Sequence, residues 1–317
     1  MKATLVIPTY NRAERLRSLL HCVSVSVSER PSVADQLAQV VIGDDGSSDA
    51  TSEVVASFRD RLPIVHAWQE DRGFRAGQAR NLGIERALGD VVIFADDDVL
   101  VGPGFVEAHL AAHAARPGER CVALGPRHRT LSFDGDVPTP EHFKEAERDD
   151  RIADLDGRPA EEHDTPWIFV YSCNFSVTLG GPELHFDDGF SGWGLEDTEL
   201  GYRLHHAGYR IFDAPNAQVL HVDDDAPRDP FRCEARRIVP SYDTYVQNAV
   251  RFMDKYPDDR MLARFIRQDL RWYVLDARGS WVKNGFENDV DLVIAECRRS
   301  LARSAGASPA SAAVESA

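Results

Sequence analysis

The sequence predicts an α/β fold in which helices flank a mostly parallel central sheet, followed by a helical C-terminal extension. Short, continuously apolar runs such as ATLVIP (residues 3–8) are typical of strands that are buried on both faces. Between these runs lie stretches whose apolar residues recur at helical spacing. Strand and helix patterns that alternate in this way predict a parallel sheet. Residues from about 240 to 302 keep the helical period alone, which predicts the extension.

The first 120 residues supply the elements of the sheet in order. Strands are expected over residues 3–8, 39–45, 64–68 and 90–100, and the second and fourth of them contain aspartates near their ends. Helices are expected over residues 16–23, 49–58, 77–89 and 104–115. The alternation weakens afterwards. Residues 132–165 form a polar, proline-containing segment that predicts a long loop or lid, and residues 167–177 predict one or two further strands.

Charge and cysteine content exclude several classes of function. The chain carries 36 basic and 52 acidic residues, a formal net charge of −16. That balance argues against sequence-independent nucleic-acid binding, which needs phosphate neutralisation, and against a polybasic membrane surface. The five scattered cysteines include no Cys-x-x-Cys pair, so neither a disulfide framework nor a zinc site is expected. Without an apolar run of membrane-spanning length, we expect a cytoplasmic protein; peripheral association with the inner membrane face stays open.

Three aspartates follow the fourth apolar run in FADDDVL, at Asp96, Asp97 and Asp98. Ligands of open parallel sheets bind beyond the carboxyl ends of the strands, where these side chains are expected. Neighbouring carboxylates repel one another unless a cation or solvent lies between them. Oxygen ligands suit Mg²⁺ or Mn²⁺, which also bind phosphate oxygens. The run therefore indicates either a divalent cation that bridges a diphosphate or a solvated acidic turn.

A second acidic pair, Asp44 and Asp45, ends the second predicted strand and is expected at the same sheet edge. A carboxylate there can accept hydrogen bonds from a nucleobase imide or a ribose hydroxyl, or it can form a turn before the next helix. The segment DRGFRAGQARN adds Arg72, Arg75 and Arg80 around glycines near a helix start. Such guanidinium groups suit a phosphate or a base edge, although exposed surface arginines fit the same pattern.

Two adjacent acids, Glu196 and Asp197, open a helical pattern directly after a glycine-rich loop that carries Trp193. One hypothesis is that the acids complement the N-terminal dipole of the helix, with the tryptophan in the core. The other is that one acid removes a proton from a substrate hydroxyl. In that case the tryptophan offers an apolar platform for a sugar ring, and Gly192 and Gly194 allow the loop to approach it closely.

Four stretches, in this order, together resemble the family 2 glycosyltransferases with the GT-A fold: VIPTYNRAERL, VVIGDDGSSDAT, RGFRAGQARNLGIERALGDVVIFADDDV and SGWGLEDTELGYRLHHAGYRI. The last stretch is similar to the W-G-x-E-D element of β-1,4-galactosyltransferases and chondroitin-polymerase-type enzymes. The resemblance covers about residues 1–225. It implies a Rossmann-like GT-A domain with Mn²⁺ or Mg²⁺ as cofactor. It also implies inverting transfer of a hexose or N-acetylhexosamine from a nucleotide diphosphate, usually UDP, to an acceptor hydroxyl.

The resemblance implies a role for each matching position. Asp197 is expected to be the base that takes the acceptor proton, and Glu196 to orient sugar or acceptor hydroxyls. Asp45 is preferred for the uracil imide. The nucleotide-sugar contacts are expected from Pro8, Thr9, Tyr10, Arg12, Asp44, Asp45, Arg75, Gly77, Arg80, Asp96, Asp97, Trp193 and Gly194. The metal ligands are expected to be Asp98, His221 and Asp96; because three aspartates stand where the family commonly has Asp-x-Asp, Asp97 is an alternative to Asp96.

Composition and resemblance together divide the chain into four parts. These are a nucleotide-sugar-binding half (1–128), an acceptor-binding and catalytic half (129–225), a helical extension (226–302) and a disordered tail (303–317). The expected partners are a UDP-sugar and an acceptor glycan, peptide or small natural product, and the extension is a candidate homodimer interface. One alternative is a nucleotidyltransferase, although PTYNRAERL lacks the glycine-rich signature of that class. Another is a non-catalytic glycan-binding protein that retains the fold.

Overall fold

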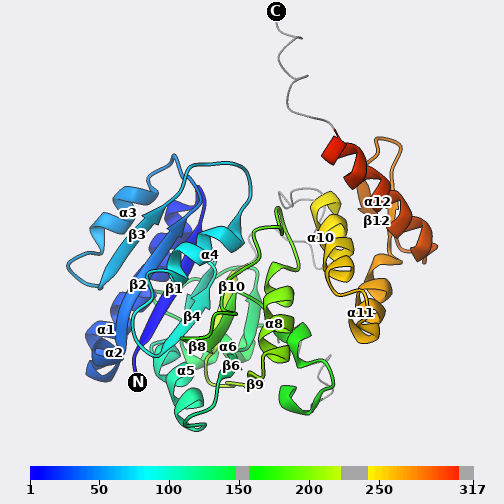
Figure 1. The fold of residues 1–317 in the computed structure, drawn as a ribbon. Helices are drawn as coiled ribbons and strands as arrows, with labels where there is room; N and C mark the ends of the chain where they lie inside the picture. The colour runs from blue at the N-terminus through cyan, green and yellow to red at the C-terminus, as the bar shows by residue number, and fades with distance from the viewer. Residues whose placement is uncertain (148–156, 223–241, 307–317) are drawn as a thin grey trace, which may run out of the picture. The chain divides into compact units, whose positions relative to one another are not determined.

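The structure is a computed structural model that describes residues 1–147, 157–222 and 242–306 (Figure 1). The chain forms two compact units. The first unit contains residues 1–189 and 196–226, and the second contains residues 190–195 and 227–317. Among the helices of the described part of the chain, none combines the length and the apolar character that crossing a membrane requires.

The first unit is built on a seven-stranded sheet with the order β3-β2-β1-β4-β8-β6-β9. Its strands are β1 (Ala3–Thr9), β2 (Leu37–Asp44), β3 (Ile64–Trp68), β4 (Val91–Ala95), β6 (Cys121–Leu124), β8 (Asn174–Thr178) and β9 (Arg210–Asp213). β1 pairs in parallel with β2 and β4, β2 with β3, and β6 with β9, whereas β8 runs antiparallel to both of its neighbours. The predicted α/β fold with a mostly parallel central sheet is confirmed.

Helices pack on both faces of this sheet, as the apolar pattern predicts. They are α1 (Ala13–Glu29), α2 (Pro31–Gln36), α3 (Thr51–Ser57), α4 (Ala76–Ile84), α5 (Phe105–Ala114), α6 (Pro140–Glu145) and α8 (Glu196–His206), with the 3-10 turns η1 (Ala160–Glu162) and η2 (Pro166–Phe169). Leu5 and Ile7 of β1 share a core with residues of α1 and α5. Val6 points to the opposite face and meets Gly83 of α4. Gly43 and Gly83 leave no room for a Cβ atom, so α4 lies unusually close to the strands.

A smaller three-stranded sheet, with the order β5-β10-β7, consists of β5 (Val99–Val101), β10 (Val219–Val222) and β7 (Arg127–Thr130). Residues 90–100 are expected as one strand, but the structure divides them into β4 and β5, with the three aspartates between them. β5 leaves the central sheet and pairs antiparallel with β10, so that His221 lies opposite Val99. The break at the aspartates therefore directs neighbouring carboxylates toward different partners.

Residues 167–177 show one strand, β8, preceded by the turn η2. Trp167 packs edge-on against Tyr202 of α8, with 5.2 Å between the ring centroids. Gly201 of the same helix meets Val170 and the Trp167 carbonyl. Packing against α8 thus overrides the β propensity of the first part of this segment. The segment expected as a loop or lid contains α6 and η1, and its residues 148–156 lie outside the described residues.

The second unit contains α10 (Tyr242–Lys255), α11 (Arg260–Leu270) and α12 (Val290–Gly306), with the hairpin strands β11 (Tyr273–Leu275) and β12 (Trp281–Lys283) between α11 and α12. These helices account for the helical period expected over residues 240–302. α12 continues to Gly306, four residues into the segment expected as a disordered tail, and the rest of that tail lies outside the described residues. The division of residues 1–225 into a donor half and an acceptor half stays a prediction.

Candidate active site

The carboxyl ends of β1, β2 and β4 bring polar side chains to one edge of the central sheet. Thr9 ends β1 and pairs in register with Asp44 of β2, while Asp96 directly follows β4. The hydroxyl of Thr9 donates to Asp97 Oδ2 over 2.7 Å, which joins β1 to the aspartate run. Parallel strands end at the same edge, and ligands of open α/β sheets bind there.

Asp97 is the most enclosed of the three consecutive aspartates, with 5% of its surface exposed. It accepts hydrogen bonds from Thr9 and, over 3.2 Å, from Arg12. Burial and the neighbouring Asp98 raise the pKa of Asp97 to about 7, against the opposing effect of Arg12. Both oxygens of Asp97 are therefore engaged by donors within the protein, and the choice between Asp96 and Asp97 as a metal ligand stays a prediction.

Asp98 and His221 are two of the side chains expected at a metal, and the structure brings them together. The antiparallel pairing of β5 with β10 places His221 next to the start of β5. His221 Nε2 lies 3.4 Å from Asp98 Oδ1, and the second oxygen of Asp98 accepts a hydrogen bond from Arg12 over 2.9 Å. Within the described residues, no group of three His, Cys, Asp or Glu side chains is arranged to hold a metal. The pair therefore offers one oxygen and one nitrogen donor, which is part of a coordination shell suited to Mn²⁺.

Arg80 of α4 joins the aspartate run to the acids at the start of α8. Its side chain is buried, and its guanidinium group donates to Asp96 Oδ1 over 2.8 Å and to Glu196 Oε1 over 3.1 Å. Burial by itself would lower the pKa of Arg80, but the two carboxylates raise it above its ordinary value. The side chain therefore stays charged, and one buried cation bridges two acids that are far apart in the sequence.

Glu196 is the more buried member of the acid pair, with 8% of its surface exposed. Burial and the adjacent Asp197 raise the pKa of Glu196 to about 7, and Arg80 counteracts part of this effect. Its Oε2 has no hydrogen-bond partner among the described residues. Gly77 lies beside it, because a Cβ atom at Gly77 would be 3.8 Å from Glu196 Cγ. A carboxyl group with an uncommitted oxygen and a pKa near neutrality can exchange a proton with a bound hydroxyl.

Asp197 is half-buried and is held by backbone donors. Its Oδ2 accepts from the N–H of Ser172 over 2.9 Å, and its Oδ1 accepts from the N–H of Thr198 over 2.7 Å. The first of these bonds ties the start of α8 to the segment before β8. Asp197 thus satisfies a backbone N–H group in the first turn of α8 while Glu196 keeps an uncommitted oxygen, so helix stabilisation and proton transfer are both compatible with the geometry.

The two aspartates at the end of β2 have different surroundings. Asp44 is buried and bonded to His66 Nε2 over 2.7 Å. Burial would raise the pKa of Asp44, but the hydrogen bonds from His66 and Ser47 outweigh it and lower the pKa. Asp45 accepts from the backbone N–H of Arg75 over 2.7 Å and lies 3.0 Å from its guanidinium group. Asp45 thus lies with Arg75 at the start of α4, and the preference for Asp45 at the uracil imide stays a prediction.

The other residues of this unit that are expected to contact the nucleotide-sugar lie near the same edge of the sheet. Pro8 is a buried residue of β1 and pairs in register with Gly43 of β2. Tyr10 is 43% exposed, and its hydroxyl donates to Asp71 Oδ2 over 2.8 Å. Arg12 precedes α1 and has about half of its side chain exposed. The roles of these residues toward a donor stay predictions.

The family model described as Glycosyl transferase family 2 matches residues 4–174, more than half of the chain. The chain belongs to glycosyl transferase family 2. A second family model, described as the N-terminal domain of galactosyltransferase, matches residues 185–224, which contain the acid pair and His221. In this family 2 chain the Arg80 bridge therefore connects the two matched regions, because Asp96 lies in the first and Glu196 in the second.

Curated relatives of this family 2 chain include enzymes that are considerably longer. It is 37% identical over 230 residues to validoxylamine A glucosyltransferase of Streptomyces hygroscopicus subsp. jinggangensis, covering 65% of the chain and 51% of the relative. It is 27% identical over 247 residues to chondroitin synthase of Escherichia coli, covering 69% of the chain and 34% of the relative. The chain thus spans about half the length of the first relative and about a third of the second.

Solved structures share the fold of this family 2 chain. TarS 1–349 of S. aureus, in complex with UDP-GlcNAc, aligns with a TM-score of 0.56 at 17% identity, covering 86% of this chain and 71% of that one. The mannosyltransferase PcManGT from Pyrobaculum calidifontis, in complex with GDP-Man and Mn²⁺, aligns with a TM-score of 0.53 at 16% identity, covering 97% and 76%. These likenesses confirm the GT-A fold.

Trp193 and Gly194 lie in a loop, residues 190–195, that belongs to the second unit of the family 2 chain. The chain continues from this loop directly into Glu196 of the first unit. Gly192 and Gly194 have φ angles of 73° and 109°, and neither has room for a Cβ atom against α10. Trp193 is 38% exposed. The glycines of this motif are therefore required by close packing of the loop on α10.

Asn248 of α10 holds the same loop in place through hydrogen bonds to its backbone. Its side chain is buried, and its Nδ2 donates to the carbonyls of Ser191 over 3.2 Å and Gly194 over 2.9 Å. Thr244, one turn earlier on α10, accepts a hydrogen bond from the N–H of Trp193 over 3.1 Å. Nothing in the sequence marks these two positions, because a threonine and an asparagine in a distant helix have the pattern of ordinary polar residues.

Proposed function

We propose that this chain is a metal-dependent, inverting glycosyltransferase that moves a hexose or N-acetylhexosamine from a nucleotide diphosphate to an acceptor hydroxyl. The observation that carries the proposal is the buried Arg80, which joins Asp96 at the edge of the sheet to Glu196 at the start of α8. The Arg80 guanidinium group thereby links two parts of the site. One is the sheet edge where we expect the nucleotide diphosphate, and the other is the acid pair that we expect to act on the acceptor. Membership of glycosyl transferase family 2 supports this assignment.

The donor is proposed to be a UDP-sugar that lies along the ends of β1 and β2. The carboxylate of Asp45 accepts a hydrogen bond from the uracil imide, and Arg75 beside it faces the base or the diphosphate. The backbone of residues 8–10 and the Arg12 side chain line the nucleotide. The UDP-GlcNAc complex of TarS, a protein with the same fold, supports the choice of UDP.

Asp98 and His221 are proposed to hold Mn²⁺ or Mg²⁺, with Asp96 as the third expected ligand. The carboxylate and imidazole of the first two are adjacent and suit these ions. A bound divalent ion would neutralise charge on the departing diphosphate. Arg12, whose guanidinium contacts Asp97 and Asp98, adds a second positive charge at this edge. The Mn²⁺ complex of PcManGT supports a divalent ion in a protein of this fold.

Asp197 is proposed as the base that takes the proton of the acceptor hydroxyl, and Glu196 orients the hydroxyls around it. In an inverting displacement the base must lie on the face of the sugar opposite the leaving diphosphate. The N–H groups of Ser172 and Thr198 hold the Asp197 carboxylate in one orientation. The sequence Trp193-Gly-Leu-Glu-Asp is similar to the W-G-x-E-D element, and the galactosyltransferase match over residues 185–224 supports this likeness.

The acceptor is proposed to be a glycan, a peptide or a small natural product, with Trp193 as an apolar platform for a sugar ring. The two relatives named above differ in the molecules that their names specify, validoxylamine A in one case and chondroitin in the other. A homodimer through the C-terminal helices and a cytoplasmic location are further predictions.

The test is a donor screen with UDP-, GDP- and dTDP-sugars in the presence of Mn²⁺, with and without EDTA. We expect slow release of UDP from one UDP-sugar, loss of release with EDTA and recovery when Mn²⁺ is restored. Release of pyrophosphate would indicate a nucleotidyltransferase, and binding of a glycan without turnover of any donor would indicate a non-catalytic glycan-binding protein. Failure to bind or hydrolyse any donor would contradict the proposal.

A further inference from the structure

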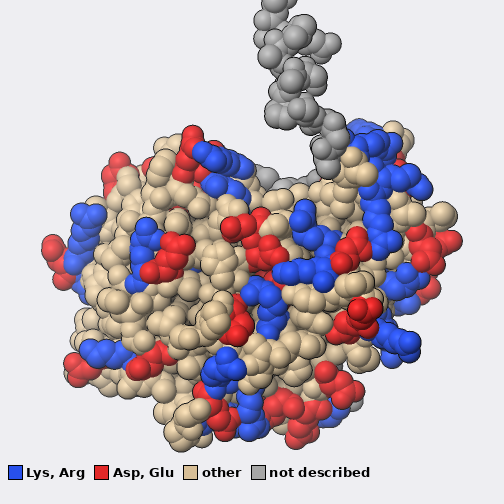
Figure 2. All heavy atoms as spheres, viewed as in Figure 1, with Lys and Arg blue, Asp and Glu red and all other residues tan. Residues whose placement is uncertain are grey.

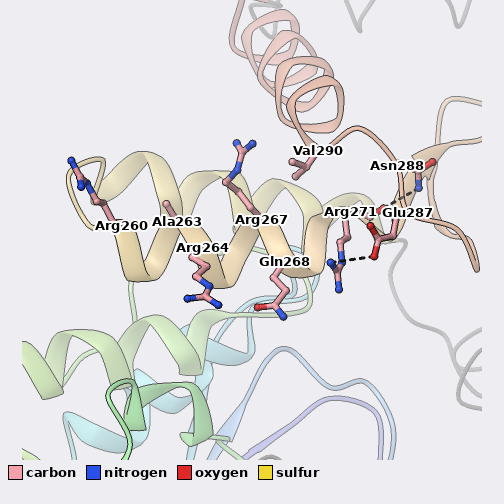
Figure 3. A pocket seen from close by; sticks show the side chains of 9 residues that line it. All are labelled: Arg260, Ala263, Arg264, Arg267, Gln268, Arg271, Glu287, Asn288 and Val290. Carbon is pink, nitrogen blue, oxygen red and sulfur yellow. Dashed lines mark hydrogen bonds and ion pairs between the residues drawn. The ribbon is translucent and has the colours of Figure 1, made fainter.

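The second unit carries an open groove of about 700 Å³ along α11, bordered by the segment that leads into α12 (Figure 3). Four arginines of α11 line this α11 groove: Arg260, Arg264, Arg267 and Arg271. Their spacing of four, three and four residues places them on one narrow stripe of the helix that extends over about 16 Å. The buried residues of α11 are Leu262, Ile266 and Leu270. The spacing of these three residues places them away from the arginine stripe. One side of α11 therefore packs against the rest of the unit, and the other side carries the four arginines.

Acidic side chains balance two of the four guanidinium groups: Glu287 lines the groove, and Asp291 lies just beyond its lining in α12. Arg267 Nη1 lies 2.9 Å from Asp291 Oδ1, and Arg271 Nη1 lies 3.2 Å from Glu287 Oε1. The other two arginines, at the N-terminal end of the stripe, are exposed and have no acidic partner in the described ranges of the chain. Like charges on adjacent helical turns repel one another, so an anion between them would be favourable.

Charge is distributed unequally between the two parts of the chain. Residues 227–317 carry 15 Lys and Arg against 13 Asp and Glu, whereas residues 1–226 carry 21 against 39. Figure 2 shows several Lys and Arg side chains on the surface of the second unit, with Asp and Glu side chains among them. A polyanion is repelled by the field of the first unit and is drawn to the basic stripe of the second. A charge difference of this kind between two parts of a chain points to an anionic partner.

We propose that the α11 groove binds a linear glycan chain that carries acid groups, either carboxylates or phosphates, and so serves as a second contact for an acidic acceptor. Arginine binds both kinds of group through paired hydrogen bonds. The turns of α11 space the backbone positions of these arginines about 5–6 Å apart, comparable to the length of a sugar unit in a chain. Gln268 also lines the groove, and its amide can bond sugar hydroxyls. The role of the bound glycan as acceptor rests on the proposed function. The binding of the glycan to the α11 groove does not.

The composition of the α11 groove favours a glycan over other polyanions. No aromatic residue lines it, so it lacks the stacking surface on which single-stranded nucleic acids bind. Glu287, which lines the groove, and Asp291, which pairs with Arg267, have 62% and 75% of their side chains exposed. A flat anionic membrane would press against these acids, whereas a narrow chain along α11 contacts the arginines alone. The groove therefore fits a chain better than a surface.

Binding at this groove would increase the affinity for the acceptor and would not change the rate of the chemical step. A polymer held on the second unit is tethered to the first unit, which raises the local concentration of its acceptor end. The expected consequence is a low KM for long acidic acceptors and no effect on donor hydrolysis.

The experiment compares the full chain with the double variant Arg260→Gln/Arg264→Gln. The control is Arg251→Gln/Arg278→Gln, which removes the same charge from exposed positions of the same unit outside the groove. Fluorescence anisotropy is measured with labelled polygalacturonate, poly(glycerol phosphate), neutral dextran and oligo-thymidine, and phosphatidylglycerol vesicles are tested by co-sedimentation. UDP release from the donor is measured for all three proteins. Circular dichroism confirms that the variants are folded.

We expect at least one of the two acidic chains to bind the unmodified protein and dextran not to bind. The groove variant should bind about tenfold more weakly, because two charge-assisted contacts are lost, while the control changes less than about twofold. UDP release should be equal in the three proteins. The proposal is overturned if neither acidic chain binds, if the control weakens binding equally, or if vesicles or oligo-thymidine bind α11 more tightly. If no UDP is released but the acidic chain still binds the groove, the proposed function is contradicted and the proposed glycan-binding site is not.

Discussion

At the scale of single residues, two adjacent acids acquire different properties from different surroundings. Glu196 is buried against Arg80, and burial together with Asp197 raises its pKa to about 7. Asp197 is more exposed and is oriented by the N–H groups of Ser172 and Thr198. A base needs an accessible, oriented carboxylate, whereas a buried acid held by a guanidinium group is better suited to positioning. This contrast is the physical reason for assigning proton abstraction to Asp197.

The assignment predicts different effects of two isosteric substitutions. Asp197→Asn removes the base but keeps an oxygen for a backbone N–H, so the kcat of transfer should fall by about 100-fold or more while donor binding is retained. Glu196→Gln removes one charge from the Arg80 bridge and should raise KM more than it lowers kcat. Steady-state transfer kinetics with the donor and acceptor found by screening provide the measurement.

The dependence of the transfer rate on pH distinguishes Asp197 as the base from Glu196 as the base. If Glu196 were the base, the rate would rise as pH increases through about 7, where its carboxyl group loses its proton, and Glu196→Gln would abolish that rise. Full transfer activity in Asp197→Asn, combined with loss of activity in Glu196→Gln, would move the role of base to Glu196.

At the scale of elements, α10 determines the shape of a loop that the sequence presents as a local motif. Asn248 bonds the carbonyls of Ser191 and Gly194, and Thr244 bonds the N–H of Trp193. These contacts satisfy backbone groups that the glycine-rich loop leaves unpaired by itself. The loop preceding the acid pair therefore depends on a helix that follows it by about fifty residues.

Replacing Asn248 by Ala should loosen this loop. Two backbone carbonyls lose a buried donor, so we expect the free energy of unfolding to fall by about 1–3 kcal/mol and kcat to fall with it. Gln247→Ala, on the same helix at a residue that makes none of these hydrogen bonds to the loop, is the matched control and should leave both quantities close to those of the unmodified protein. Urea denaturation and transfer kinetics are measured for each variant. Normal kcat in a measurably destabilised Asn248→Ala protein would show that the loop geometry does not affect transfer.

At the scale of the whole molecule, stability depends on a buried polar network in the first unit. His109 and His113 of α5 bond the hydroxyl of Ser176, and His109 also bonds Asn174, all within the core. Burial lowers the pKa of His109 to about 3 and that of His113 to about 4. Both side chains are therefore neutral in the folded protein. Asn174 also donates to two backbone carbonyls, so it is a structural residue.

The lowered pKa of His113 predicts a pH-dependent contribution to stability. An unfolded histidine titrates near 6.5, so folding is favoured above that pH, and this contribution is lost as pH falls toward 4. The destabilisation caused by His113→Gln should accordingly be about 1.4 kcal/mol smaller at pH 5.5 than at pH 7.5. Urea denaturation of both proteins at the two pH values gives the difference.

The comparison with a variant is needed because other groups oppose this effect. The pKa values of Asp97 and Glu196 are raised to about 7, so these acids favour folding increasingly as pH falls below 7. Their contribution cancels when two proteins that share them are compared. A destabilisation by His113→Gln that does not change with pH would show that His113 is not held neutral by burial.

The sequence by itself determined the fold class, the main strands and helices of the first 115 residues and the sheet edge that carries both acidic clusters. These features follow from local apolar periodicity and from the rule that parallel strands end together. It did not show the break that separates β4 from β5, because continuous apolar character predicts one strand whether or not the chain changes sheets. Nor did it show the turn at Trp167, where packing on α8 outweighs β propensity.

Only the tertiary structure decided which of these residues meet. The antiparallel register of β5 and β10 brings His221 to Asp98, and close packing of α4 on the sheet lets Arg80 reach both Asp96 and Glu196. Pairings of this kind depend on register, on distances across the fold and on the burial of charge, none of which local periodicity contains. The sequence therefore identified the chemistry of the candidate site, and the fold decided its pairing.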